Sequence, residues 1–389
     1  MNERSALYAL LRHGAMSRVE LDRAIGLSKP AAAELLRRLE TNGLVRRSGF
    51  QPVHGPGPLA QLWTVNVAAG YAAGVDISAT AIDVAIADLG GTVVGEAKEV
   101  TRGNPTQDPV RTVRSAVQAA ARSCSLNISD VVHTVAGIQG SVDPATGHLE
   151  YAPHMPRWQG FDVRQRLSAA LGHPVTVEND VNLVTVDEVA TANRQGRGLR
   201  NVVLLWMSRG VAVACMIDGR LVRGSRGGAG EIDRVSMEHA GANVAFRDLL
   251  SNRAVLNLAR SHDISSTTIT AAVRRGMTSH PAFVNELAAR ATQALAGPVA
   301  LLDPELVILA GDVAMAAEKA LATAVAERLH EMLAHRPEVA VAAGAAHSVR
   351  QGALHAAVGA AREEVLGRGV GETADLESWL LPQSPPTSA

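Results

Sequence analysis

Residues 17–47 constrain the fold of this chain most, because they predict two short helices joined by a tight turn. Ser17 is a favourable N-cap, with a glutamate three residues later in the capping-box position. Gly26 ends this helix, and Ser28 and Pro30 begin the next one. The pattern is typical of a helix-turn-helix, although an ordinary helical hairpin can carry the same caps.

The second of these helices has one apolar and one basic face. The predicted buried stripe consists of Ala32, Leu35, Leu36 and Leu39, and the opposite face carries Lys29, Ala33, Arg37 and Arg38. Residues 1–60 contain nine Lys or Arg and five Asp or Glu, a net charge of +4, whereas the whole chain has a net charge of −1. A basic end on a slightly acidic chain favours a DNA-binding module over a plain hairpin.

The flanking segments extend this pattern to a winged helix. A short helix over residues 5–12 comes first, and strands over 44–47 and 61–67 enclose a Gly/Pro-rich loop over 49–59. The loop has no arginine at its tip, so a DNA contact there is weak or confined to phosphates. A plain linker is the alternative interpretation of this loop.

From residue 71 the sequence predicts an α/β fold in which strands alternate with helices. The predicted strands lie within 71–100 and over 131–138, 174–177, 201–207, 211–217, 306–310 and 339–341. The predicted helices span 108–122, 183–193, 246–260, 265–275, 281–302, 316–334 and 353–363. We therefore expect a DNA-binding domain over 1–70, an α/β domain over 71–365, and a Pro/Ser-rich, disordered tail over 366–389.

Composition excludes several classes of protein. Two cysteines, Cys124 and Cys215, cannot form a disulfide framework or a Cys-rich zinc site. The first residues form no signal peptide, and no apolar run reaches the roughly eighteen residues that a membrane span needs. The sequence therefore predicts a soluble, cytoplasmic protein.

A series of ordered segments resembles the ROK family (repressor, open reading frame, kinase), and with the helix-turn-helix it resembles that family's transcriptional repressors. The segments are Gly74-Val75-Asp76, Asp88-Leu89-Gly90-Gly91, residues 137–143, Pro156-Arg157-Trp158, residues 178–182, residues 227–232 and residues 302–305. Each segment alone is weak evidence for the family, but all of them in this order are a specific sign of it. The resemblance implies two ribonuclease-H-like (actin- or hexokinase-like) α/β lobes that close over a cleft.

The same resemblance supplies candidate ligand-binding residues. Asn179 and Asp180 match the pair that binds sugar hydroxyls, and in kinase members this Asp is the catalytic base. Gly140 and Ser141 belong to the first sugar loop, and Glu231 matches the first residue of the second sugar segment. A turn or a helix N-cap is the alternative for Asn179 and Asp180.

Three departures from the family pattern concern nucleotide binding. Residues 76–80 lack the glycine of the first phosphate loop, and residues 207–212 lack the usual Gly/Thr-rich sequence. The late strand ends in Ala310-Gly311-Asp312, where two glycines are usual. We therefore expect no kinase activity, no catalytic residue and no cofactor.

A fourth departure is Arg234, which stands where the family has a histidine that contacts sugar and ligates zinc in many members. The family's zinc-binding cysteines are also missing, so the sequence predicts no metal. Arg234 suggests an effector with negative charge, such as a sugar phosphate. In the alternative, Arg234 pairs internally with Asp233 or Glu231 and the pocket is closed.

These observations predict a sequence-specific DNA-binding regulator, expected to be a repressor, of carbohydrate metabolism. Its predicted partners are a double-stranded DNA operator and a sugar or sugar-phosphate effector. The resemblance also implies further copies of itself in a homodimer or homotetramer. The predicted DNA-binding residues are Ser17, Arg18, Ser28, Lys29, Pro30, Ala33, Arg37, Arg38 and Arg46. Two alternatives are a ROK sugar kinase with an accessory DNA-binding domain, and a ligand-independent regulator controlled by a protein partner.

Overall fold

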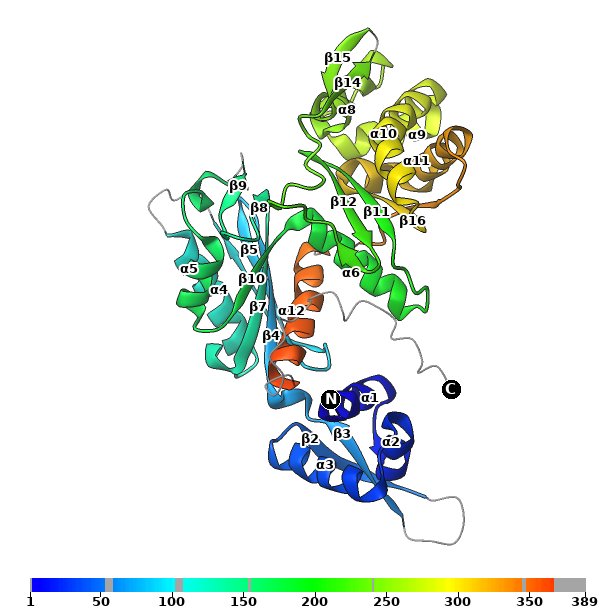
Figure 1. The fold of residues 1–389 in the computed structure, drawn as a ribbon. Helices are drawn as coiled ribbons and strands as arrows, with labels where there is room; N and C mark the ends of the chain where they lie inside the picture. The colour runs from blue at the N-terminus through cyan, green and yellow to red at the C-terminus, as the bar shows by residue number, and fades with distance from the viewer. Residues whose placement is uncertain are drawn as a thin grey trace.

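The computed structural model shows a small N-terminal domain followed by two larger α/β lobes (Figure 1). It describes residues 2–52, 59–101, 108–152, 155–239, 241–344 and 348–366. Each lobe is built on a five-stranded sheet. This architecture agrees with the predicted winged helix-turn-helix and two ribonuclease-H-like lobes. The predicted tail, apart from Leu366, lies outside the described residues.

The N-terminal domain contains the predicted helix-turn-helix. Its elements are α1 (Asn2–His13), β1 (Met16–Ser17), α2 (Arg18–Ile25), α3 (Lys29–Thr41), β2 (Val45–Gln51) and β3 (Ala60–Val65). The capping box of α2 is confirmed, because the Ser17 hydroxyl accepts from the Glu20 N–H and the Glu20 carboxylate accepts from the Ser17 N–H. Gly26 ends α2 with a φ of 69°. The predicted stripe of α3 is buried against α1 and α2.

The strands of this domain form a small antiparallel sheet in the order β1-β3-β2. β2 is longer than predicted and pairs with β3 as far as Gln51, past an irregularity between Arg47 and Gly49. A paired hairpin after the second helix identifies a winged helix, so the plain-linker interpretation is wrong. The tip of the loop, residues 53–58, lies outside the described residues.

The first lobe has a sheet in the order β10-β7-β4-β5-β6, in which β4, β7 and β10 are parallel. Its elements are β4 (Tyr71–Ile77), β5 (Ala81–Asp88), β6 (Val93–Val100), α4 (Pro109–Ser123), β7 (Val131–Ile138), β8 (Ser141–Val142), β9 (Leu149–Tyr151), α5 (Val163–Leu171) and β10 (Val175–Asn179). Helices α4 and α5 cover one face, and α12 (Ser348–Leu366) covers the other (Figure 1).

The second lobe has a sheet in the order β13-β12-β11-β16-β17. Its elements are α6 (Asp180–Arg194), β11 (Val202–Met207), β12 (Val211–Ile217), β13 (Arg220–Leu221), β14 (Ser236–His239), β15 (Ala242–Ala245), α7 (Phe246–Leu250), α8 (Asn252–Ser261), α9 (Ile269–Ser279), α10 (Pro281–Leu302), β16 (Leu306–Ala310), α11 (Gly311–Met332) and β17 (Glu338–Val341). Its main core is mostly aliphatic, with Phe246 and Phe283 among its members, and is formed by α7 to α11 with one face of the sheet.

Some predicted helices have different bounds for local reasons. The helix expected over 246–260 is divided into α7 and α8, because Ser251 is extended and its hydroxyl accepts from the Ala254 N–H as a new cap. The helix expected from residue 183 begins at Asp180, since Asn179 caps it. By contrast, β7, β12, α10 and β16 have the predicted bounds.

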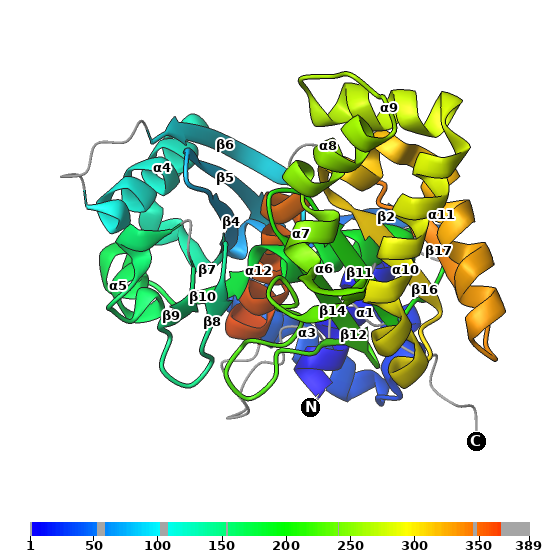
Figure 2. The same ribbon diagram turned by 90° about the horizontal axis from the view of Figure 1, so that it is seen from above.

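Helices α6 and α12 lie next to each other between the two sheets (Figure 2). Their contact is close at Gly352 of α12, where a Cβ atom would lie 1.9 Å from the carbonyl oxygen of Leu183 in α6. Only glycine permits this approach. α12 is therefore held against the helix whose first residue, Asp180, faces the space between the lobes.

The C-terminal end of α12 contacts the N-terminal domain. The Glu363 carboxylate accepts hydrogen bonds from the Tyr8 hydroxyl and the Arg4 guanidinium, both at 2.5 Å. Burial and this carboxylate raise the pKa of Tyr8 above its usual range. One helix thus connects α6 with α1. Among the described helices, none is both long and apolar enough to cross a bilayer.

Candidate functional site

A cavity of about 470 Å³ lies between the two lobes and is lined by both. The first lobe contributes the turn over residues 78–80 and the loop over 139–140, and the start of α6 contributes residues 179–181. The second lobe contributes residues 208–212 together with Glu231 and Asp233. The volume is in the range of small-molecule sites, about 300–1,000 Å³.

Asn179 is both a helix cap and part of the cavity wall. Its side-chain oxygen accepts from the N–H groups of Val181 and Asn182 at 2.8 and 3.1 Å. Its amide nitrogen donates to the carbonyl oxygen of Gly140 at 3.0 Å. The N-cap interpretation is therefore correct as a description of the fold, and it also fixes the loop that carries Gly140 beside the cavity.

Asp180 is the first residue of α6 and brings a carboxylate to the cavity. Burial, assisted by the nearby carboxylates of Asp76 and Glu231, raises the pKa of Asp180 to about 7. Both protonation states are then populated near neutral pH. The side chain can thus accept a hydrogen bond from a ligand hydroxyl in one state and donate one in the other.

Glu178 holds this segment through a contact that the sequence analysis missed. One carboxylate oxygen accepts from the Asn179 N–H and from the side-chain amide of Asn182, both at 2.8 Å. The other oxygen accepts from Arg223 of the second lobe at 2.6 Å. No sequence pattern indicates this pair, because its members are 45 residues apart and belong to different lobes.

The second lobe reaches the first through the glycine-rich segment after β13. A Cβ atom on Gly227 would lie 1.9 Å from the carbonyl oxygen of Val142, so glycine is needed for the segment to cross β8. The same segment brings Glu231 to the cavity, where burial and Asp233 raise its pKa. Asp233 itself accepts from the Val211 N–H and pairs with Arg247 at 3.5 Å.

Two predicted ligand residues do not lie on the cavity wall. Ser141 is 4% exposed, and its hydroxyl donates to the carbonyl oxygen of Arg226 instead. Arg234 is exposed and is not part of the wall, so it neither closes the cavity nor places a cation in it. The cavity thus brings together Gly140, Asn179, Asp180 and Glu231, and its wall carries a different arginine, Arg209.

A carboxylate occupies the position where the family pattern predicts nucleotide approach. Asp312, in the first turn of α11, accepts from the Ser208 hydroxyl at 2.6 Å and from the Asn252 amide at 2.7 Å. The contact fixes the turn between β11 and β12 against α11 and α8. A nucleotide phosphate that approached the start of α11 would meet this negative charge.

The segment in place of the family's zinc loop forms the β14–β15 hairpin. Within the described residues, no group of three or more His, Cys, Asp or Glu side chains could hold a metal ion.

The exposed face of α3 is the candidate DNA interface. Lys29, Pro30, Ala33 and Arg37 are exposed on it, and Ser28 precedes it without a side-chain capping bond. Arg18 at the start of α2 and Arg46 on β2 are also exposed. Ser17 was predicted to contact DNA, but only 6% of this residue is exposed and its hydroxyl caps α2.

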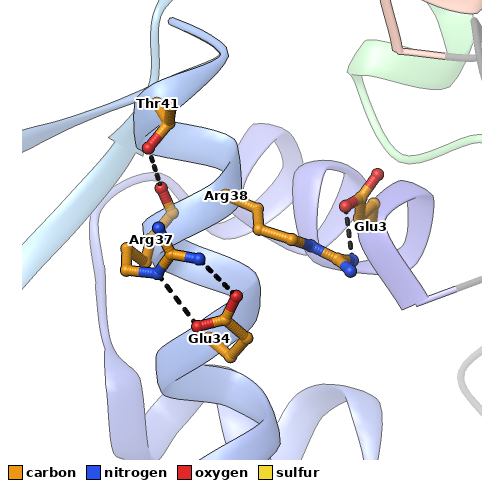
Figure 3. A network of polar contacts seen from close by, with 5 residues as sticks. All are labelled: Glu3, Glu34, Arg37, Arg38 and Thr41. Atoms are coloured by element: carbon orange, nitrogen blue, oxygen red, sulfur yellow. Dashed lines mark hydrogen bonds and ion pairs between the residues drawn. The ribbon is translucent and has the colours of Figure 1, made fainter.

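Both arginines of α3 are paired with carboxylates. Arg37 binds Glu34 through two hydrogen bonds of 2.5 and 2.9 Å (Figure 3). Arg38 extends from α3 toward α1, where it binds Glu3 at 2.5 Å (Figure 3). The two arginines of α3 therefore point in different directions (Figure 3), and only Arg37 lies on the face of Lys29 and Ala33.

The comparisons with known proteins separate the same two parts of the chain. Residues 72–362 match the sequence profile of the ROK family, and residues 1–49 match that of the MarR family. The chain is 21% identical over 363 residues to the xylose repressor of Caldicellulosiruptor bescii, covering 87% of this chain and 89% of that protein. It is 26% identical over 268 residues to the glucokinase of Streptomyces coelicolor, covering 62% of this chain and 82% of that enzyme.

A solved structure has the same fold over nearly the whole chain. It is a ROK family transcriptional regulator, described as a homologue of the E. coli MLC protein, with a TM-score of 0.74 and 17% identity. The similarity covers 97% of this chain and 98% of that structure. The profile match spans most of the chain, and the shared fold agrees with it, so the chain belongs to the ROK family.

Proposed function

We propose that this protein is a DNA-binding transcriptional regulator, expected to be a repressor of carbohydrate metabolism, whose ROK domain binds a sugar or sugar derivative. The observation that carries the proposal is that one chain joins a winged helix with an exposed α3 to a cleft lined by carboxylates. The MarR profile match and the similarity to a xylose repressor support it.

In this proposal, α3 enters the major groove of a double-stranded operator. Ser28, Lys29 and Pro30 lie at its start, and Ala33 offers an apolar contact to a thymine methyl group. Phosphate contacts come from Arg18, Arg37 and Arg46, which are all exposed. Ser17 and Arg38 act indirectly, because Ser17 caps α2 and Arg38 holds α3 to α1.

The ligand side of the proposal uses Gly140, Asn179, Asp180 and Glu231, whose polar groups can bind sugar hydroxyls. Closing of the lobes around a ligand would change the position of α12 and, through Glu363, that of the N-terminal domain. In a homodimer or homotetramer this changes the separation of two α3 helices and shifts the DNA-bound population. Operator binding would place the protein in the cytoplasm.

The rival function is that of a sugar kinase, since the relatives include a glucokinase. Asp312 and the missing glycine in residues 76–80 disfavour phosphoryl transfer from ATP, because they place a charge and a Cβ atom where the family pattern predicts the phosphates of a nucleotide. A coupled assay for ATP turnover with a panel of sugars tests this directly. Turnover that is lost in Asp180→Asn would contradict our proposal.

Footprinting of genomic DNA fragments, with and without a panel of sugars and sugar phosphates, tests the proposed function. We expect protection of a specific site and a change in protection with at least one compound. Protection that no compound alters would favour a ligand-independent regulator controlled by a protein partner. The absence of any protected fragment at moderate salt would overturn the proposal.

A further inference from the structure

Besides the carboxylates of Asp180 and Glu231, the wall of the interlobe cavity carries other polar side chains. Two turns line the cavity, residues 78–80 between β4 and β5 of the first lobe and residues 208–210 between β11 and β12 of the second. Thr80 brings an exposed hydroxyl-bearing side chain, and Arg209 brings a guanidinium. A ligand in the cavity can therefore contact polar side chains of both lobes.

Arg209 differs from the other arginines near the cleft in its contacts. Arg223 pairs with Glu178, and Arg247 pairs with Asp233. Arg209 has no hydrogen bond or ion pair to any residue that the structure describes, although it lies on the cavity wall. A guanidinium without a protein partner is a ready donor for the oxygens of a phosphate or carboxylate.

The turn that carries Arg209 is loosely packed at the next residue, Gly210. A Cβ atom on Gly210 would have only the Asp233 carboxylate within 4 Å, at 3.9 Å, so the space beside the turn is open. That carboxylate is paired with Arg247. Asp312 is bound to Ser208 and Asn252 and is not part of the cavity wall.

We propose that the cleft binds a phosphorylated sugar, with its phosphate on Arg209 and its hydroxyl groups on Asn179, Asp180 and Glu231. The inference rests on the proposed sensor function and specifies its ligand class. The charges on the cavity wall orient the ligand, because Arg209 attracts the phosphate and the carboxylates repel it. The raised pKa of Asp180 reduces that repulsion near neutral pH.

Calorimetric titration of the full chain tests this assignment with neutral hexoses, pentoses and N-acetylhexosamines, their phosphate esters, the corresponding sugar acids, and inorganic phosphate. We expect one phosphate ester to bind at least about tenfold more tightly than its neutral sugar. Arg209→Ala should remove most of this difference and leave the affinity for the neutral sugar within about twofold. Arg234→Ala is the matched control, because it removes an arginine outside the cavity, and it should keep the preference.

Several outcomes would overturn the assignment. One is equal affinity for sugar and phosphate ester, and another is a preference for phosphate that survives in Arg209→Ala or is lost in Arg234→Ala. Tighter binding of a sugar acid than of any phosphate would identify a carboxylate ligand and contradict the phosphate. If no compound binds at all, the sensor function itself fails. An unchanged melting temperature and DNA affinity of Arg209→Ala confirm that this variant is folded.

Discussion

The cleft and the exposed face of α3 arrange charge in opposite ways. In the cleft, carboxylates are gathered, and burial together with two neighbouring acids raises the pKa of Asp180 to about 7. On α3, Arg37 is exposed and paired with Glu34 in water. Burying a charge without a counter-ion destabilises a fold, whereas an exposed ion pair contributes little.

The difference indicates how each surface can bind a partner. In the cleft, a ligand hydroxyl can donate a hydrogen bond to a carboxylate that burial withholds from water in the free protein. Ligand binding therefore also stabilises the fold. On α3, a DNA phosphate replaces Glu34 as the partner of Arg37, so binding is an exchange of ion pairs and depends on salt.

The largest effect that we predict concerns the pH dependence of stability. Because the pKa of Asp180 is about 7 in the folded state and lower in the unfolded chain, the folded state binds more protons between about pH 4 and 7. Stability therefore falls as the pH rises through this range. We expect Asp180→Asn to be more stable than the wild type by roughly 3 kcal/mol at pH 8, and about equal at pH 4, in urea unfolding.

Asp187→Asn is the matched control for this variant. Asp187 also lies on α6, and burial and Glu188 raise its pKa to about 7, but it is not part of the cavity wall. Both variants should flatten the pH profile, and only Asp180→Asn should lower sugar affinity. An unchanged profile in Asp180→Asn would contradict a destabilising carboxylate in the cleft.

The second prediction tests the exchange of ion pairs on α3. Arg37→Ala should weaken DNA binding about tenfold for all sequences and reduce the salt slope by about one, because one phosphate contact is lost. Glu34→Ala should strengthen binding several-fold, since it removes a carboxylate that competes with phosphate for Arg37. Fluorescence anisotropy at several salt concentrations measures both.

In the same experiment, Lys29→Ala distinguishes recognition of the base sequence from electrostatic attraction to DNA. It should change the preferred bases, because Lys29 lies at the start of α3. Weaker binding of Glu34→Ala would show that Glu34 contacts a base instead of competing with phosphate. A uniform loss for Lys29→Ala would mean that α3 does not read the sequence.

Much of the fold was predictable because its signals are local. The buried stripe of α3 and the bounds of β7 and β16 follow from apolar periodicity within about ten residues. The sequence analysis missed that the helix predicted over 246–260 is divided at Ser251. A single residue in an extended conformation interrupts a sequence pattern that is otherwise helical.

The site was less predictable, because side-chain direction and contacts between lobes are tertiary properties. Gly140 lines the cavity whereas its neighbour Ser141 points away from it. The choice between Arg234 and Arg209 as the cleft cation depends on which turn faces the other lobe, and no motif indicates that. The pairing of Glu178 is equally hidden, because its partner follows 45 residues later.

The third prediction concerns the connection between the two surfaces. Tyr8→Phe removes one of the hydrogen bonds that join α1 to the end of α12 at Glu363. We expect the effect of ligand on DNA affinity to fall about fivefold, while sugar binding and DNA binding measured separately change little. Anisotropy titrations with and without ligand measure this coupling, and full coupling in both Tyr8→Phe and Glu363→Gln would exclude this contact as the route.

The smallest effects that we predict concern the two serines that precede α2 and α3. Ser17→Ala should lower the free energy of unfolding by about 0.5–1 kcal/mol, because its hydroxyl caps α2 within a reciprocal capping box. Ser28→Ala should change stability less, since the Ser28 side chain makes no capping bond. If the exposed face of α3 binds DNA, as the exchangeable ion pair between Arg37 and Glu34 suggests, then Ser28→Ala should instead weaken DNA binding. Equal destabilisation by both substitutions, with DNA affinity unchanged in Ser28→Ala, would assign Ser28 to the fold and restrict the DNA-binding surface to the charged side chains.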